Sequence, residues 1–212
     1  MKNTVTLRDF REAFADRTPG PLDRHRYYSV LVPLVERDGV VHLLYQLRSE
    51  TLRRQPGEVG FPGGKVEAGE TPLACAVRET VEELCIPRES IEVIGELDYI
   101  YSRGDFTMYA FLASIADTDF ARAFNRAEVQ DVFLVPVSFF LENEPEIYRY
   151  ELAPKVGADF PYDKIQPKGA YKWRTSSESV PIYNCEGRAI WGLTGRITLH
   201  LINILKETVL TT

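Results

Sequence analysis

Residues 71–84 constrain the fold most strongly, because they form one amphipathic helix with acidic groups beside its apolar face. The apolar and small positions recur at helical spacing and make an inward stripe of Leu73, Ala76, Val77, Thr80 and Leu84. Glu79, Glu82 and Glu83 stand at i, i+3 and i+4, so the three carboxylates fall within an arc of roughly 100°. Any fold that buries the stripe must therefore place three acids at the rim of its core.

Three like charges on one helix face call for a compensating partner. Like charges at i,i+4 destabilise an isolated helix by roughly 0.2–0.5 kcal/mol. Beside a low-dielectric wall, two charges about 4 Å apart repel by on the order of 4 kcal/mol before solvation and relaxation. Only Arg78 supplies a cation within the stretch. One interpretation is a solvated acidic face, which is common; the other is a divalent ion, for which oxygen-only ligands favour Mg2+ or Mn2+ over zinc.

A loop of residues 48–71, punctuated by glycine and proline, runs into this helix. A loop of that length inside a compact domain is uncommon and usually functional. Gly57, Gly60, Gly63 and Gly64 permit tight turns and close backbone approach, and the free N–H groups of a helix start suit phosphate. A metal beside such a loop indicates phosphoryl chemistry, in which the ion polarises a phosphoryl oxygen and a carboxylate takes a proton from water.

The rest of the chain predicts a mixed α and β fold, interpreted as one domain over residues 1–212. Strands are predicted at 28–35, 40–47, 91–99, 106–115, 132–137 and 147–152, with a hairpin turn at 36–39, and helices at 7–16, 71–84 and 194–209. Thr71 and Pro72 suit the start of the second helix. Residues 153–180 are rich in Lys, Pro, Gly and Ser and are interpreted as an irregular insertion or lid.

Composition and charge argue against several kinds of binding partner and cellular location. The formal net charge of −6 disfavours general affinity for nucleic acid or an anionic membrane. No apolar run approaches the roughly 20 residues that span a bilayer, and no secretory signal pattern precedes the first helix, so a cytoplasmic location is expected. The three cysteines lack CxxC spacing, which argues against a disulfide framework or a zinc site.

The helix and its loop resemble the Nudix box, G-x5-E-x7-R-E-U-x-E-E-x-G-U. The matching string is Gly64-x5-Glu70-x7-Arg78-Glu79-Thr80-x-Glu82-Glu83-x-Cys85-Ile86. The departures are Thr80, where a bulky aliphatic is usual, and Cys85, where a glycine normally ends the helix. The resemblance implies an α+β fold, an α/β/α sandwich with a mixed β-sheet between helices. It also implies hydrolysis of a nucleoside diphosphate linked to another group.

By the same resemblance, Glu79, Glu82 and Glu83 hold the Mg2+ or Mn2+ ions, and one of them is a possible base. Arg78, counted with the catalytic residues, and Glu70 would support their geometry.

Three further segments are similar to the coenzyme A pyrophosphatase subfamily of Nudix hydrolases. They are Leu44-x3-Arg48-Ser49-x2-Leu52-Arg53-x3-Gly57-Glu58-Val59-x-Phe61-Pro62-Gly63-Gly64, Asn125-x2-Glu128-Val129 with Phe133-x-Val135-Pro136, and Ile190-Trp191-Gly192-Leu193-Thr194-Gly195-Arg196-Ile197. The resemblance implies cleavage of coenzyme A into 3′,5′-ADP and 4′-phosphopantetheine. Residues 97–111 depart from the subfamily pattern, which makes substrate choice the least constrained inference.

Cations are expected near the acidic site, because coenzyme A carries a pyrophosphate and a 3′-phosphate. Arg48 and Arg53, with Arg54 beside them, can fork onto phosphate oxygens; a solvated loop with ion pairs is the alternative. Gly63 and Gly64 are expected to contact the substrate as part of the same loop. Glu128 is expected as a further metal ligand or base, or else as an ordinary surface glutamate.

Two other functions remain open at this stage. An ADP-ribose or other nucleoside-diphosphate pyrophosphatase would use the same carboxylates. A non-catalytic nucleotide-binding Nudix regulator would be expected to have lost some of them, whereas this chain retains Glu79, Glu82 and Glu83. The expected partner is a small nucleotide, and the sequence leaves oligomeric state open, with a homodimer as one option.

Overall fold

A mixed β-sheet forms the centre of the protein in a computed structural model that describes residues 5–102, 106–116, 124–165 and 171–208. Its strands are β1 (Arg26–Arg37), β2 (Val40–Arg48), β3 (Val59–Gly60), β4 (Gly63–Lys65), β5 (Ile91–Ser102), β6 (Phe106–Ile115) and β7 (Val129–Pro136). The path runs β3-β2-β1-β6-β5, with β4 also paired to β1 and β7 to β2. β1 and β6 are parallel, and the other pairs are antiparallel.

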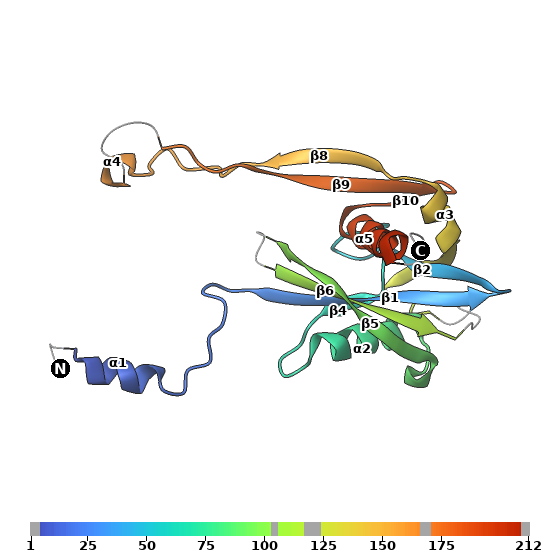
Figure 1. The fold of residues 1–212 in the computed structure, drawn as a ribbon, viewed down its shortest axis with the longest axis horizontal. Helices are drawn as coiled ribbons and strands as arrows, with labels where there is room; N and C mark the ends of the chain where they lie inside the picture. Colours follow the sequence, from blue (N-terminus) through green and yellow to red (C-terminus); the bar gives the residue numbers. More distant parts are fainter. Residues whose placement is uncertain (1–4, 103–105, 117–123, 166–170, 209–212) are drawn as a thin grey trace.

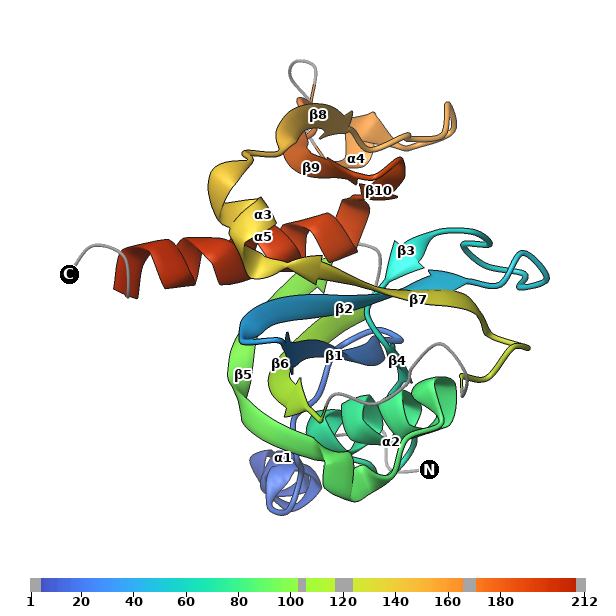
Figure 2. The same cartoon turned by 90° about the vertical axis from the view of Figure 1, so that its right-hand side faces the viewer.

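Helices cover both faces of this sheet, as Figures 1 and 2 show. Because side chains alternate along a strand, Leu31 of β1 packs with the buried residues of α2 (Pro72–Leu84). Its neighbour Val32 packs with α5 (Gly192–Thr208) on the other face. Tyr45 Oη lies 2.9 Å from Thr198 Oγ1, which fixes α5 against β2. The predicted α+β sandwich, with a mixed sheet between helices, is confirmed.

The carboxylate helix α2 begins and ends close to the predicted positions. Thr71 is its N-cap, with its hydroxyl accepting from Ala74 N at 3.2 Å. Thr80 is buried on the core face, and its hydroxyl donates to Ala76 O at 2.7 Å, so the polar group is satisfied there. Cys85 ends the helix in the left-handed region, with φ 52°. The cysteine thus adopts the conformation that glycine usually supplies at this position.

The loop expected at residues 48–71 is more ordered than predicted. β3 pairs with β2, and β4 pairs with β1 through Val30↔Gly63 and Tyr28↔Lys65. The prediction of a wholly irregular segment was wrong because these strands have only two and three residues, too few for a periodic signal. The predicted hairpin turn between β1 and β2 is confirmed, with Asp38 and Gly39 both at positive φ.

A second sheet of three strands forms an arm above α5 (Figure 1). Its strands are β8 (Glu146–Leu152), β9 (Ser176–Cys185) and β10 (Arg188–Ile190), and it carries α4 (Tyr162–Ile165) at its tip, while α3 (Val137–Glu142) leads into it. Residues 176–180, predicted to be irregular, pair with β8 instead. The ladder to a distant strand decides their conformation, since their own sequence shows little strand preference.

The first helix in the described residues is α1 (Leu7–Phe14), two residues shorter than the prediction of 7–16. A capping box joins Thr6 and Asp9 at its start, and Leu7, Phe10 and Phe14 remain exposed. A short 3-10 turn, η1 (Arg88–Ser90), links α2 to β5. In the part of the chain that the structure describes, no helix is both long and apolar enough to cross a lipid bilayer.

The left-handed conformation of Cys85 gives a stability prediction. Cys85→Gly is expected to raise the free energy of unfolding by about 0.5–1 kcal/mol, because glycine relieves the Cβ strain at positive φ and recovers more than its entropic cost. Urea denaturation followed by circular dichroism measures this. Cys85→Ala, which keeps the Cβ, serves as the control and should leave the stability near that of the parent; a gain equal to that of glycine would contradict the strain argument.

Candidate active site

Glu83 is the most buried acid of α2, with 2% of its surface exposed. Its Oε2 accepts hydrogen bonds from the backbone N–H of Gly63 at 2.9 Å and from Gln46 Nε2 at 3.0 Å. Burial raises the pKa of Glu83 to about 7, although both hydrogen bonds favour the ionised form. Gln46 is a site residue that the sequence analysis missed; the available signal was a lone amide after the apolar run of β2.

Arg78 links three of the predicted site glutamates in one ionic cluster. Its Nη1 lies 3.0 Å from Glu79 Oε1 and 3.2 Å from Glu82 Oε2. Its Nε lies 2.9 Å from Glu70 Oε1. The hydrogen bonds from Arg78 lower the pKa of Glu70, whereas burial raises the pKa of Glu79 despite the same arginine. Arg78 therefore orients the carboxylates and offsets their mutual repulsion.

Gly63 and Gly64 carry the backbone closely past two elements. A Cβ on Gly63 would collide with Ser29 O of β1, and a Cβ on Gly64 would collide with the Glu79 carboxylate. The contact at Gly63 is with backbone and admits no side chain, whereas a side chain at Gly64 would displace the Glu79 carboxylate. This close approach explains the paired glycines in structural terms.

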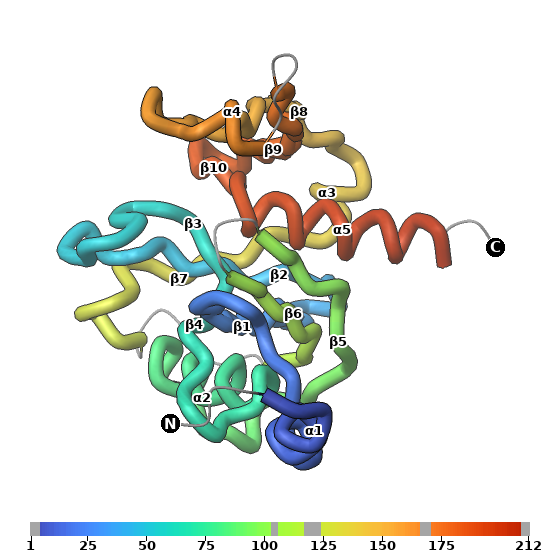
Figure 3. The backbone as a smooth tube through the Cα atoms, turned by 90° about the vertical axis from the view of Figure 1, so that its left-hand side faces the viewer, coloured from blue at the N-terminus to red at the C-terminus, as the bar shows by residue number. Residues whose placement is uncertain are grey.

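Glu128 reaches the same site from a distant part of the sequence. Asn125 N donates to Glu83 O at the end of α2 at 2.9 Å, and Glu128 N donates to Asn125 O at 3.0 Å. Ser49 N donates to Glu128 O at 2.9 Å, so the segments after β2 and before β7 lie side by side (Figures 2 and 3). The hydrogen bond from Asn125 therefore brings the segment that carries Glu128 to the C-terminal end of α2.

These carboxylates form a donor set that suits a hard divalent cation. Glu79, Glu82, Glu83 and Glu128 offer oxygen ligands only, as Mg2+ and Mn2+ prefer. Within the described ranges, no three acidic, cysteine or histidine side chains already converge on a single point. Arg78 instead lies between Glu79 and Glu82. The residue types fit the ion, and binding would require these side chains to turn toward it.

A cavity of about 580 Å³ opens beside the glycine pair, on the α5 side of the sheet. Gly63, Gly64 and Arg48 line it, whereas Arg53 and the predicted catalytic carboxylates do not. The wall includes residues that the sequence analysis had not assigned to the site: Arg26, Tyr28, Phe106, Met108 and Trp191. Their positions on separate strands and on the turn before α5 gave no local pattern that could have joined them.

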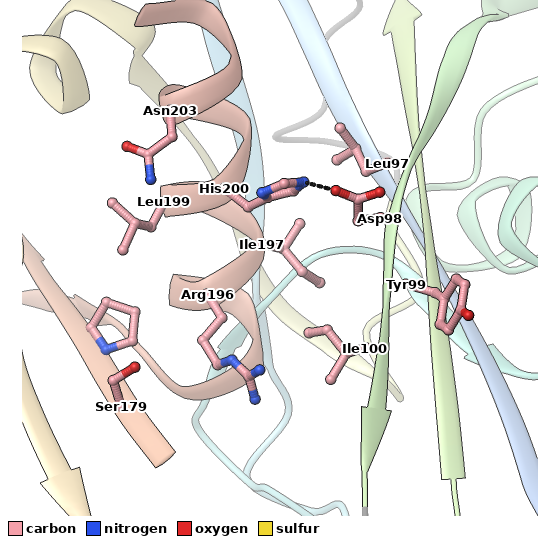
Figure 4. A pocket seen from close by; sticks show the side chains of 11 residues that line it. Leu97, Asp98, Tyr99, Ile100, Ser179, Arg196, Ile197, Leu199, His200 and Asn203 are labelled. Atoms are coloured by element: carbon pink, nitrogen blue, oxygen red, sulfur yellow. Dashed lines mark ion pairs between the residues drawn. The ribbon is translucent and has the colours of Figure 1, made fainter. Parts of the chain in front are cut away.

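A second cavity of about 300 Å³ lies on the other side of α5, against β5 (Figure 4). His200 Nε2 lies 2.9 Å from Asp98 Oδ2 across it, and Arg196 extends along its wall. It is lined by none of Gly63, Gly64 and Arg48, which line the larger cavity. It is therefore separate from the candidate active site.

Comparison with known proteins decides the family. Residues 25–154 match the NUDIX domain. This chain belongs to the Nudix family. The match includes α2, the glycine loop and Glu128, so the geometry above is that of a Nudix hydrolase.

Several relatives carry names that bear on the substrate. A peroxisomal coenzyme A diphosphatase from Mus musculus is 36% identical over 135 residues, covering 63% of this chain and 56% of that protein. A mitochondrial coenzyme A diphosphatase from the same species is 31% identical over 198 residues, covering 92% of this chain and 85% of that protein. An uncharacterized Nudix hydrolase from Citrobacter koseri is 38% identical over 206 residues, covering 95% and 96%.

The fold also has a solved counterpart. A MutT/nudix family protein from Enterococcus faecalis superposes with a TM-score of 0.51 at 14% identity, covering 96% of this chain and 70% of that one. This likeness concerns the fold alone.

The contact between Gly64 and Glu79 gives a test of the site geometry. Gly64→Ala is expected to lower kcat/KM for nucleotide hydrolysis by on the order of 100-fold, because the new methyl group displaces the Glu79 carboxylate. The fold should persist, since the clash is with the end of a flexible side chain. Steady-state kinetics and thermal melting measure the two effects.

Gly95→Ala is the matched control for this substitution. A Cβ at Gly95 of β5 would meet nothing within 4 Å, so activity should be unchanged. Full activity in Gly64→Ala would contradict the placement of Glu79 in the working site.

Proposed function

We propose that the protein is a metal-dependent coenzyme A diphosphatase that releases 3′,5′-ADP and 4′-phosphopantetheine. The observation that carries the proposal is the junction at Gly63 and Gly64, where the carboxylate helix meets a cavity lined by arginines. The two relatives named as coenzyme A diphosphatases support the choice of substrate. So does the Arg48–Gly64 segment, which is similar to that subfamily.

Glu79, Glu82 and Glu83 are the residues proposed to hold Mg2+ or Mn2+. When bound, the ion supplies Lewis-acid polarisation of the phosphoryl oxygen and a lowered pKa for the attacking water. Glu128, whose segment is hydrogen-bonded to the end of α2, is the residue proposed to accept the proton of that water. Water adds to one phosphorus, the bridging P–O bond breaks, and the leaving phosphate carries away the electron pair.

Two arginines have different proposed roles in this attack: one binds the substrate, and the other orients the carboxylates. Arg48 lines the cavity together with Gly63 and Gly64, and its guanidinium is proposed to bind the pyrophosphate there. Arg78 keeps Glu79 and Glu82 oriented. In this proposal the small nucleotide is the partner, and the cytoplasmic location and homodimer stay predictions.

A substrate panel tests the proposed reaction. Coenzyme A, ADP-ribose, NADH and diadenosine polyphosphates are to be compared with Mn2+ present, and kcat/KM is expected to be highest for coenzyme A. Chelation of the metal with EDTA should abolish turnover, and added Mg2+ or Mn2+ should restore it. Strong turnover of ADP-ribose without turnover of coenzyme A would contradict coenzyme A as the substrate but would leave the assignment as a pyrophosphatase intact.

The carboxylates themselves are tested by charge-neutral substitution. Glu82→Gln and Glu83→Gln are each expected to lower kcat at least 100-fold, because loss of a transition-state contact of several kcal/mol has that effect. Circular dichroism should show the fold retained, since glutamine preserves side-chain volume. Unchanged turnover in both variants would contradict the metal assignment and favour a binding-only protein.

A further inference from the structure

The floor of the main cavity is built from one face of two neighbouring parallel strands. Arg26, Tyr28 and Val30 alternate along β1 and therefore share a face. Phe106 and Met108 of β6 lie beside the first two in the parallel register Arg26↔Phe106 and Tyr28↔Met108. The rings of Tyr28 and Phe106 meet edge to face with centroids 5.9 Å apart.

This floor has a direction relative to the carboxylate helix. Gly63 pairs with Val30 at one end of the floor. Arg26 lies four residues away along β1, a distance of about 13 Å at the usual rise of a strand. The floor thus runs from the glycine pair, across an aromatic surface, to a cationic end.

The cavity is cationic although the chain as a whole is acidic. Its charged lining residues are Arg26, Arg48, Arg54 and Glu58, three cations against one carboxylate, in a chain of net charge −6. Arg48 has a buried Nε with no hydrogen-bond partner among the described residues, so this donor is available to an acceptor in the cavity. If Arg48 serves the pyrophosphate, Arg26 and Arg54 are positioned for a different anion.

We propose that Arg26 and Arg54 bind a second phosphate group of the nucleotide, separate from the scissile pyrophosphate, and so select 3′-phosphorylated substrates. The proposal rests on the proposed function, in which the substrate is coenzyme A and this group is its 3′-phosphate. The ribose separates that phosphate from the pyrophosphate, as the aromatic floor separates Arg26 from Gly63. A guanidinium can engage two phosphate oxygens at once, which makes the interaction both strong and directional.

The sequence analysis treated the loop arginines as one group of phosphate-binding candidates, whereas the cavity distinguishes between them. Arg54 lines the cavity and its neighbour Arg53 does not. Arg26 comes from a different part of the chain and would not be grouped with them by sequence. A substrate whose only phosphates are the scissile pair gains no contact from Arg26 and Arg54, so the two residues act on specificity.

The first experiment compares coenzyme A with 3′-dephospho-coenzyme A in full-length enzyme with Mn2+. The parent enzyme should prefer coenzyme A. Arg54→Gln and Arg26→Gln should each lower kcat/KM for coenzyme A by about tenfold to a hundredfold, as expected for lost hydrogen bonds to a charged group. Turnover of the dephospho compound should change by less than about twofold, because it lacks the contact.

Arg24→Gln is the matched control. Arg24 is exposed, lies two residues before Arg26, and does not line the cavity. The substitution therefore removes the same charge outside the proposed site. It should leave the preference between the two substrates unchanged. Equal losses on both substrates in Arg54→Gln and Arg26→Gln, an equal effect of Arg24→Gln, or a larger effect of Arg53→Gln would overturn the assignment.

A binding measurement separates failure of this inference from failure of the proposed function. Calorimetric titration with 3′,5′-ADP and with 5′-AMP needs no turnover. The parent should bind 3′,5′-ADP more tightly, by about tenfold or more, and Arg54→Gln should remove that difference. This result without hydrolysis of coenzyme A would overturn the proposed reaction but retain the second phosphate site. Hydrolysis of coenzyme A together with equal affinity for both nucleotides would retain the proposed reaction and overturn the second phosphate site.

Discussion

The buried carboxylate of Glu83 holds the active-site region together. It belongs to α2, yet its hydrogen bonds come from Gly63 of β4 and Gln46 of β2, so one side chain ties three elements. A buried charge without such partners would be strongly unfavourable, which makes this arrangement of the three elements specific. Glu79 and Glu82 lie on the same helix face, so their positions follow from the same attachment.

The sheet separates two tasks that the site must combine. The acidic helix packs on one face, and the arginine-lined cavity opens on the face that carries α5. The two meet at Gly63 and Gly64, where a Cβ would collide with the backbone of β1 or with Glu79. Small size at these two positions therefore lets the carboxylate helix and the arginine-lined cavity share one edge.

Much of the fold was predictable because long amphipathic segments carry their own periodicity. The helix at 71–84, the hairpin turn at Asp38 and Gly39, and the strands forming β1, β2, β5 and β6 were all predicted near their observed positions. The segments that were predicted wrongly are either very short or paired with strands far away in the sequence. β3 and β4 are too brief to show a pattern, and residues 176–180 are extended because β8 lies beside them.

The sequence alone determined the carboxylate set, because Glu79, Glu82 and Glu83 lie within one helical turn and local spacing dictates their common face. It also brought out the family resemblance, which depends on residue order along the chain. Only the tertiary structure decided that the segment of Glu128 is hydrogen-bonded to the end of α2, that Gln46 supports Glu83, and that Arg26 and Arg54 line one cavity. Those relations depend on strand pairing and chain crossings between residues far apart in sequence, and no local periodicity records them.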